Sequence, residues 1–205
     1  MKALCTLAAM GLTLTSAAAA PSLAVRSNPT DSPSTIASFV ARSGNGFDSN
    51  PFDYDLLLKA ASTAGLVGAL SDPNARLTLF APNDGAFITL ARDLGYGGYS
   101  ESGAWDFLVG ALTNLGNGDP IPVLQQVLLY HVAPVRINAI QFVILGLTNQ
   151  TITTLQGGTV KPVGLRLVDN EPDLANPSLF LPLNVVTGNG TIHTISRVLI
   201  PLNLP

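Results

Sequence analysis

The chain has 205 residues, of which 47% are hydrophobic and 11% are charged, and its formal net charge is −3. This length and composition are typical of one globular domain with a full core. The ten basic side chains are scattered along the chain, which excludes the concentrated basic surface that nucleic-acid binding requires.

Residues 1–24 have the order of a secretory signal peptide, with an approximate cleavage point. Lys2 gives a positive start, an apolar run extends from Ala3 to Leu14, and small residues follow as far as Ala20. About 20 apolar residues are needed to span a bilayer, so this run is too short for a transmembrane helix. The sequence therefore predicts a secreted, extracellular protein.

One domain is expected after this leader. Residues 25–35 are polar and rich in turn formers, which predicts a flexible lead-in, and the domain then covers residues 36–205. Cys5 is the only cysteine and lies in the leader, so we expect no disulfide and no thiol in the mature protein. No hydrophobic tail follows the last predicted strand, which predicts that a GPI-type lipid anchor is absent.

The first part of the domain predicts two helices. One carries Ile36 and Val40 on the same face. The other begins at Asp53 or Asp55 and keeps an apolar stripe as far as Ala64.

The stretch from Leu77 to Phe87 predicts a strand, a turn and a capped helix in succession. Its first residues favour a short buried strand, which must stop at Pro82 because proline has no amide proton to donate within a sheet. Asn83 or Asp84 then supplies a side-chain oxygen that can cap the N-terminus of the next helix.

Three further helices and a series of short strands are expected in the rest of the chain. The helices cover 105–115, a segment that starts at Asp119, and 137–147. The β-branched runs that follow predict strands at 151–155, 159–161, 165–168, 178–181 and 191–200. Helices first and strands later are typical of an α+β domain. The closing strand is the natural partner of the strand before Pro82.

Three ordered motifs resemble those of the fasciclin (FAS1) domain family. Residues 78–87 read Thr-Leu-Phe-Ala-Pro-Asn-Asp-Gly-Ala-Phe, which is similar to the first signature segment of that family. Tyr130-His131 matches its central pair, and residues 189–201 match its closing segment, Asn-Gly-x-Ile-His followed by a β-branched run and a proline. The resemblance extends from about residue 36 to residue 205.

The resemblance implies a fold and a function. The fold would be a wedge of short β-strands flanked by helices. The function would be that of a secreted binding module without catalysis, which associates with extracellular-matrix or cell-surface proteins or glycans in cell adhesion. In some members of the family the region around the Tyr-His pair is an integrin-binding determinant, which would make Tyr130 and His131 a binding site here. The Asp-Ile segment of the family, also linked to adhesion, aligns with Asn184-Val185 and so lacks its carboxylate.

The residues around Tyr130-His131 favour a structural interpretation instead. Leu128 and Leu129 precede the pair and Val132 follows it, so both side chains are expected to point inward and brace the core. The adhesive interpretation remains as the alternative.

No catalytic, metal or cofactor site is predicted. The chain lacks the local motifs of serine hydrolases, zinc proteases and phosphate-binding loops. Its two histidines, His131 and His193, lie in apolar surroundings and could share a metal ion only with a distant carboxylate such as Asp84. We therefore expect core histidines, no metal, no cofactor and no enzyme activity. A carrier of a small apolar ligand or lipid is the alternative function.

Two segments have the acceptor pattern for N-glycosylation. They are Asn149-Gln-Thr and Asn189-Gly-Thr. The first lies between predicted elements. The second overlaps the closing turn, where we expect the asparagine to be needed for a positive φ angle.

Overall fold

The computed structural model describes residues 35–42 and 46–201. The predicted leader, residues 1–24, and residues 25–34 of the predicted lead-in lie outside the described residues.

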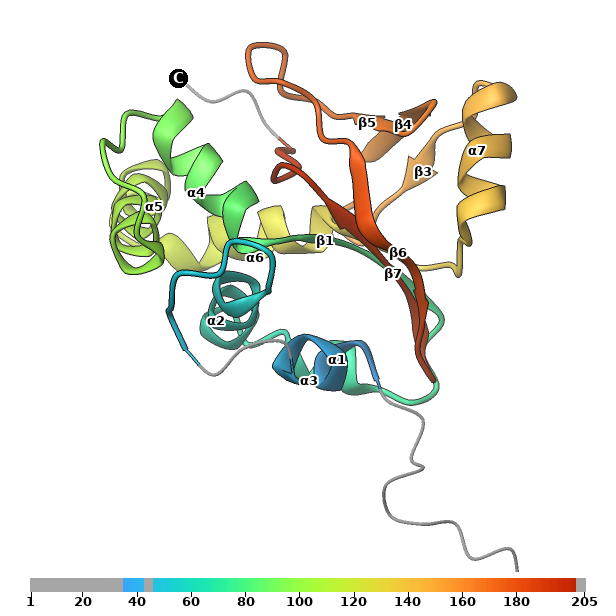
Figure 1. Cartoon of the computed structure of the whole chain (residues 1–205), viewed down its shortest axis with the longest axis horizontal. Helices are drawn as coiled ribbons and strands as arrows, with labels where there is room; N and C mark the ends of the chain where they lie inside the picture. Colours follow the sequence, from blue (N-terminus) through green and yellow to red (C-terminus); the bar gives the residue numbers. More distant parts are fainter. Residues whose placement is uncertain (1–34, 43–45, 202–205) are drawn as a thin grey trace, which may run out of the picture. The chain divides into compact units, whose positions relative to one another are not determined.

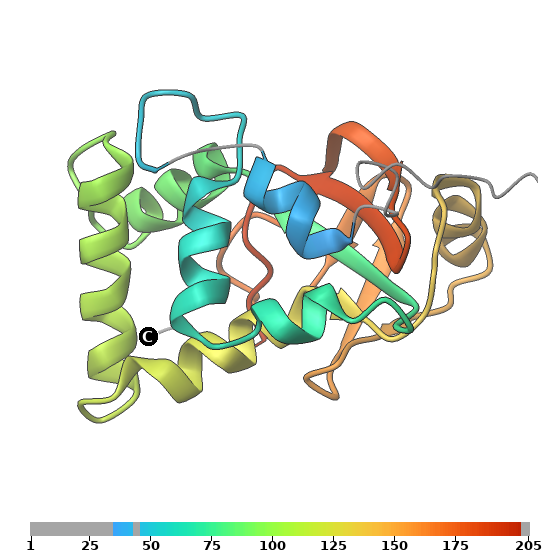
Figure 2. The same cartoon turned by 90° about the horizontal axis from the view of Figure 1, so that it is seen from below.

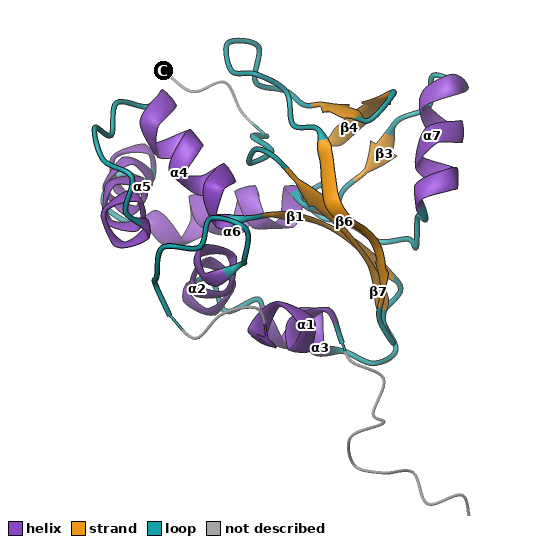
Figure 3. Cartoon of the chain, viewed as in Figure 1, coloured by secondary structure: helices purple, strands orange, loops and turns teal. Residues whose placement is uncertain are grey.

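Helices occupy the first part of the described chain and strands dominate the last (Figure 3). The helices are α1 (Ile36–Arg42), α2 (Asp55–Thr63), α3 (Val67–Ser71), α4 (Asp84–Asp93), α5 (Glu101–Leu115), α6 (Pro120–Tyr130) and α7 (Ala139–Leu147). The strands are β1 (Leu77–Pro82), β2 (Val132–Ala133), β3 (Ile152–Thr153), β4 (Thr159–Val163), β5 (Arg166–Val168), β6 (Leu179–Val186) and β7 (Gly190–Ile195). This order confirms the predicted α+β class.

The central sheet has the strand order β2-β1-β7-β6, and β3-β4-β5 form a second, smaller antiparallel sheet. β1 and β7 pair in parallel, with Phe80 opposite His193 and Pro82 opposite Ile195. The predicted pairing of the opening and closing strands is thereby confirmed. Figure 1 shows this pair at the centre of the described domain.

The central sheet separates two hydrophobic cores, because side chains alternate between the faces of a strand. Leu79 and Ile192 belong to the core that is shared with α1, α2, α4, α5 and α6. Phe80 and Ile195 belong to a second core, which contains Phe142 of α7 and side chains of the smaller sheet. Figures 1 and 2 show the first group of helices on one side of β1 and β7, with α7 and the smaller sheet on the other.

Side-chain caps fix where several helices begin. Asn83 accepts a hydrogen bond from the Ala86 amide at 3.0 Å, as the sequence predicts for the start of α4. Asp84 caps a different helix, α2, because its two carboxyl oxygens accept from the amides of Asp55 and Leu56 at 3.0 and 2.8 Å. One Asn-Asp pair therefore fixes two helices.

The closing strand is shorter than the sequence predicts. β7 ends at Ile195, whereas the β-branched pattern extends to Ile200. Side chains replace the strand partner beyond this point. The Leu199 amide donates to the imidazole of His131, and the Ile200 amide donates to the carboxylate of Asp169, both at 2.9 Å.

Other boundaries also differ from the prediction. β6 extends to Val186, well past the predicted end at Leu181, and its register with β7 shifts between Phe180 and Val185. The short elements α3 and β2 are absent from the prediction, because five and two residues respectively carry no periodic signal.

Candidate functional site

Tyr130, the last residue of α6, has no exposed surface. Its hydroxyl donates a hydrogen bond to the Thr159 carbonyl of β4 at 2.7 Å. Burial, and secondarily the charge of Asp169, raise the pKa of this hydroxyl to about 12. The side chain therefore stays neutral and joins α6 to the smaller sheet.

His131 is also buried, with an exposed fraction of 1%. Its Nε2 accepts from the Leu199 amide at 2.9 Å, so Nδ1 carries the proton and donates to the Val127 carbonyl at 2.8 Å. Burial lowers the pKa of His131 to about 4. Both side chains of the pair point inward, as their neighbours in the sequence predict. The binding role of Tyr130 and His131 remains a prediction.

His193 lies in the centre of β7 with no exposed surface. Its Nδ1 accepts from the Asn184 amide at 3.3 Å, and its Nε2–H donates to the Ile137 carbonyl at 2.9 Å. Burial lowers its pKa as well. The two histidines thus hold opposite neutral tautomers, and all four ring nitrogens have partners.

We expect neither imidazole to titrate near pH 6.5 in the folded protein. The folded pKa of His131 lies below the unfolded value, so the unfolded chain binds more protons between pH 6.5 and about 4. The stability contributed by the neutral ring is present above pH 6.5 and is lost as the pH falls through this window. The chain has only these two histidines, so their two Cε1–H signals in an NMR titration report the result directly. A shift centred near pH 6.5 in the folded state would contradict the assignment.

The two predicted glycosylation sites differ in accessibility. Asn149 and Thr151 are exposed, and Asn149 has a φ of 57° at the end of α7. Asn189 has no exposed surface, and its Nδ2 donates to the carbonyls of Leu70 and Asp72, each at 2.9 Å. The expectation that Asn189 is needed for a positive φ is wrong, since its φ is not positive and its side-chain bonds explain its place. Asn149 stays a predicted site.

An apolar face on α7 was not foreseen from the sequence. Of its nine residues only Phe142 is buried, and Leu145 packs partly buried against the same second core. Four aliphatic side chains are exposed: Ile140, Val143, Ile144 and Leu147. We call these four residues the α7 face. An open groove of about 420 Å³ runs beside it, between residues 134–137 and 151–153.

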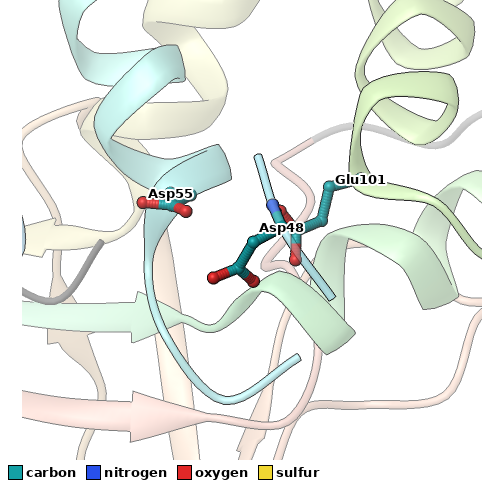
Figure 4. Close-up of side chains that lie close together, drawn as sticks. All are labelled: Asp48, Asp55 and Glu101. Carbon is teal, nitrogen blue, oxygen red and sulfur yellow. The ribbon is translucent and has the colours of Figure 1, made fainter. Parts of the chain in front are cut away.

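A cluster of five carboxyl groups lies where three helices begin. Asp55, Asp84 and Glu101 are the first residues of α2, α4 and α5, and Asp48 and Asp53 come from the segment before α2. One oxygen from each of Asp48, Asp55 and Glu101 lies within 4.8 Å of the other two, and Asp53, Asp84 and Glu101 form a second such group. Figure 4 shows the first group, with each side chain reaching in from a different segment.

Burial shapes the chemistry of this cluster. It raises the pKa of Asp84 to about 8, and the neighbouring Asp53 side chain adds to the effect. It also raises the pKa values of Asp55 and Glu101, although the backbone amides of Gly46 and Asp48, respectively, act against it. Sequence reasoning could not find this cluster, because Asp84 and Glu101 lie far along the chain from the other three carboxylates and no metal-binding spacing links them.

A lipid carrier would need a large apolar cavity between the helices and the sheet. The apolar cavity that the described residues form there is small. An apolar cavity among α4, α5 and α6 has a volume of about 60 Å³, and Leu94, Trp105 and Leu112 are among its lining residues. Sites for small molecules are typically about 300–1,000 Å³. This cavity does not have room for a lipid.

Comparison with known proteins identifies the family. The Fasciclin domain model matches residues 53–201, more than half of the chain. A search of curated proteins gives no match. The structure of a FAS1 domain pair from the insect cell adhesion molecule Fasciclin I aligns with a TM-score of 0.58 and 16% identity, over 82% of this chain and 51% of that chain. This chain spans about half the length of that pair, and at this identity the likeness shows the fold. The chain belongs to the Fasciclin domain family.

Proposed function

We propose that this chain is a secreted binding module that attaches to a protein of the cell surface or extracellular matrix and acts in cell adhesion. Membership of the Fasciclin domain family and the signal-peptide order of residues 1–24 support this function. The similar solved structure comes from a cell adhesion molecule. No helix in the described part of the chain is long and apolar enough to cross a membrane.

The exposed α7 face is the observation that carries the proposal. Ile140 and Leu147 are 72% and 82% exposed, although aliphatic side chains gain free energy when they leave water. Contiguous apolar surface of this kind marks interaction sites on soluble domains. The groove beside α7 would let a partner chain contact more than the helix alone.

The composition of α7 favours a protein partner over a lipid surface or a glycan. Residues 139–147 contain no charged side chain. Helices that lie on anionic membranes usually carry Lys or Arg on their polar face, and α7 has none. Glycans are recognised mainly through polar groups, whereas this face is aliphatic. An apolar surface on a protein partner is the best complement to it.

The proposal predicts that Ile144→Asp abolishes attachment without unfolding the domain. Ile144 is 51% exposed, so the charge is tolerated in the free protein but becomes costly when a partner covers it. Cell attachment to surfaces coated with the purified chain is measured beside a thermal melt. We expect attachment to weaken at least about tenfold, which corresponds to a loss of ~1.4 kcal/mol of binding free energy. The melting temperature should be nearly unchanged.

Controls separate the other possible partners. Tyr99→Ser changes an exposed aromatic residue between α4 and α5 and should leave attachment intact. Proteolysis of the cell surface should remove attachment, because the proposed partner is a protein. Binding of the chain to protein-free lipid vesicles would assign the α7 face to a lipid surface instead. Formation of a dimer would assign it to a second copy of this chain. Equal attachment by Ile144→Asp and the unsubstituted chain would contradict the proposal.

The same assay distinguishes the α7 face from Tyr130-His131. Tyr130→Phe keeps the buried ring and removes the hydroxyl that donates a hydrogen bond to the Thr159 carbonyl. We expect attachment to follow only the folded fraction in this variant. Lost attachment with a normal melt would assign the binding site to the Tyr-His pair.

A further inference from the structure

The carboxyl cluster at the start of α2 has no cationic partner in the part of the chain that the structure describes. The one ion pair among these residues joins Arg197 and Asp93, neither of which belongs to the cluster. The cluster therefore gathers five acidic groups, none of which forms an ion pair with a described basic side chain: Asp48, Asp53, Asp55, Asp84 and Glu101. Like charges this close repel one another, so an ionised cluster requires a counter-charge.

Asp55 is the member of the cluster whose carboxylate most lacks a partner. Its exposed fraction is 4%, and neither of its carboxyl oxygens accepts a well-aligned hydrogen bond from the described residues. The Gly46 amide lies close enough to act on the carboxyl electrostatically, without meeting that geometry. A buried carboxylate without a partner is strongly unfavourable, because burial removes the water that would otherwise stabilise its charge. Asp55 therefore points to a ligand.

The other carboxylates divide into ligands and supports. Both oxygens of Asp84 already accept backbone amides at the start of α2, and one oxygen of Asp53 accepts from the Asn50 side chain at 3.0 Å. Glu101 uses one oxygen, Oε2, for the Asp48 amide at 2.7 Å. Asp48 uses one oxygen, Oδ1, for the Asn50 amide at 2.6 Å. Among the described residues, the group of Asp48, Asp55 and Glu101 thus keeps the most oxygens without a hydrogen bond: both of Asp55 and one each of the other two.

We propose that Asp48, Asp55 and Glu101 form a binding site for a Ca²⁺ ion. Four of the six carboxyl oxygens have no hydrogen bond from the described residues. Ca²⁺ takes about 6–8 oxygen ligands at about 2.3–2.6 Å, so water or carbonyl oxygens would complete its shell. Two oxygens on one Ca²⁺ can thus stand up to about 5 Å apart, which accommodates the separations of up to 4.8 Å within this group. Figure 4 shows the three side chains that would surround the ion.

The donor set argues against other common metals. Zinc prefers nitrogen and sulfur ligands, yet both histidines have all their ring nitrogens engaged in the cores, and the only cysteine is Cys5. Mg²⁺ demands near-ideal octahedral geometry at about 2.0–2.1 Å and is usually bound by one or two carboxylates with several waters, so a group of three carboxylates favours Ca²⁺.

A bound ion would join three segments that no disulfide connects. Asp48 belongs to the segment before α2, whereas Asp55 and Glu101 begin α2 and α5. Binding to the folded state alone stabilises that state in proportion to the logarithm of ligand concentration. Ca²⁺ would therefore act as a cross-link between helices at the concentrations found outside cells.

The test is calorimetric titration of the chelator-treated full chain with CaCl₂, together with thermal melts. We expect one ion per chain, a Kd of about 0.1–1 mM as in extracellular modules, and a rise in melting temperature of about 3–10 °C in 10 mM CaCl₂. MgCl₂ at the same concentration should give a smaller shift.

Two variants make the result specific. Asp55→Asn should weaken Ca²⁺ binding at least about tenfold and raise the melting temperature of the ion-free protein, because it removes an unpaired charge. Asp106→Asn makes the same change at an exposed position of α5 and should leave the calcium response intact. If Asp55→Asn fails to fold, Glu101→Gln serves in its place, since its amide oxygen can still accept the Asp48 amide. The absence of bound Ca²⁺ at 10 mM CaCl₂ would overturn the proposal, as would a full calcium response in Asp55→Asn. A melting temperature that changes with pH but not with CaCl₂ would also overturn it.

Discussion

Phe80→Ala is expected to lower the free energy of unfolding by about 3–5 kcal/mol, the usual cost of removing a buried phenylalanine side chain. Phe80 has no exposed surface and lies in the central strand β1. Its ring centroid is 6.2 Å from that of Phe142 and 6.1 Å from that of His193, so the second core closes around it. The neighbouring strands are held by their own hydrogen bonds and can collapse only partly into the cavity.

Urea denaturation of the purified chain measures this loss, with Phe52→Ala as the matched control. Phe52 is 64% exposed, and its only ring contact among the described residues is a stacked pair with Phe180 at 6.3 Å. We expect its replacement to cost less than ~1 kcal/mol. A loss below ~1 kcal/mol for Phe80→Ala would show that β1 is not central to stability.

Asn189→Ala is expected to cost about 2–4 kcal/mol, because it leaves several backbone groups without partners. The Oδ1 of Asn189 accepts from the Ile36 amide at 2.9 Å, and its Nδ2 donates to the carbonyls of Leu70 and Asp72. One side chain before β7 thus holds the first residue of α1 and the end of α3. Alanine can replace none of these bonds, and the site has no exposed surface for water.

Two measurements distinguish this role from a general loss of packing. Urea denaturation gives the free energy, and amide hydrogen exchange should show faster exchange at Ile36 in Asn189→Ala than in the unsubstituted chain. Asn114→Ala, at an exposed position of α5, is the control and should change stability by no more than ~0.5 kcal/mol. Unchanged protection at Ile36 would show that the α1 contact is dispensable.

The sequence predicts the elements whose signals are local. Leu77–Pro82 alternates and stops at a proline, and Asn83 is a cap with a helix directly after it, so strand, turn and helix follow from adjacent residues. The end of β7 could not be predicted in this way. It depends on His131 and Asp169, which lie far away in the chain and satisfy the amides that a longer strand would have paired.

The candidate sites were harder to predict for the same reason. The sequence indicates a helix at residues 139–147 but not that its aliphatic side chains stay in water, because that depends on how little of α7 the second core covers. The carboxyl cluster forms only when α2 and α5, which both pack against α4, bring their first residues close together. Glu101 and Asp55 carry no shared motif that would reveal this. The sequence indicates a turn role for Asn189, whereas in the structure its side-chain amide bonds to the backbone of α1 and α3.

The parallel pairing of β1 with β7 constrains how this chain can fold. The two central strands are separated by more than a hundred residues, so the middle of the sheet must wait until Ile195 has been synthesised. Contacts between distant segments slow folding, since a long loop has to close before the contacts can stabilise it. Until β7 has been synthesised, the edge of β1 that pairs with it has no partner strand, which is a liability for aggregation. Chains that are cut short before Gly190 should therefore lose the centre of the domain rather than its edge.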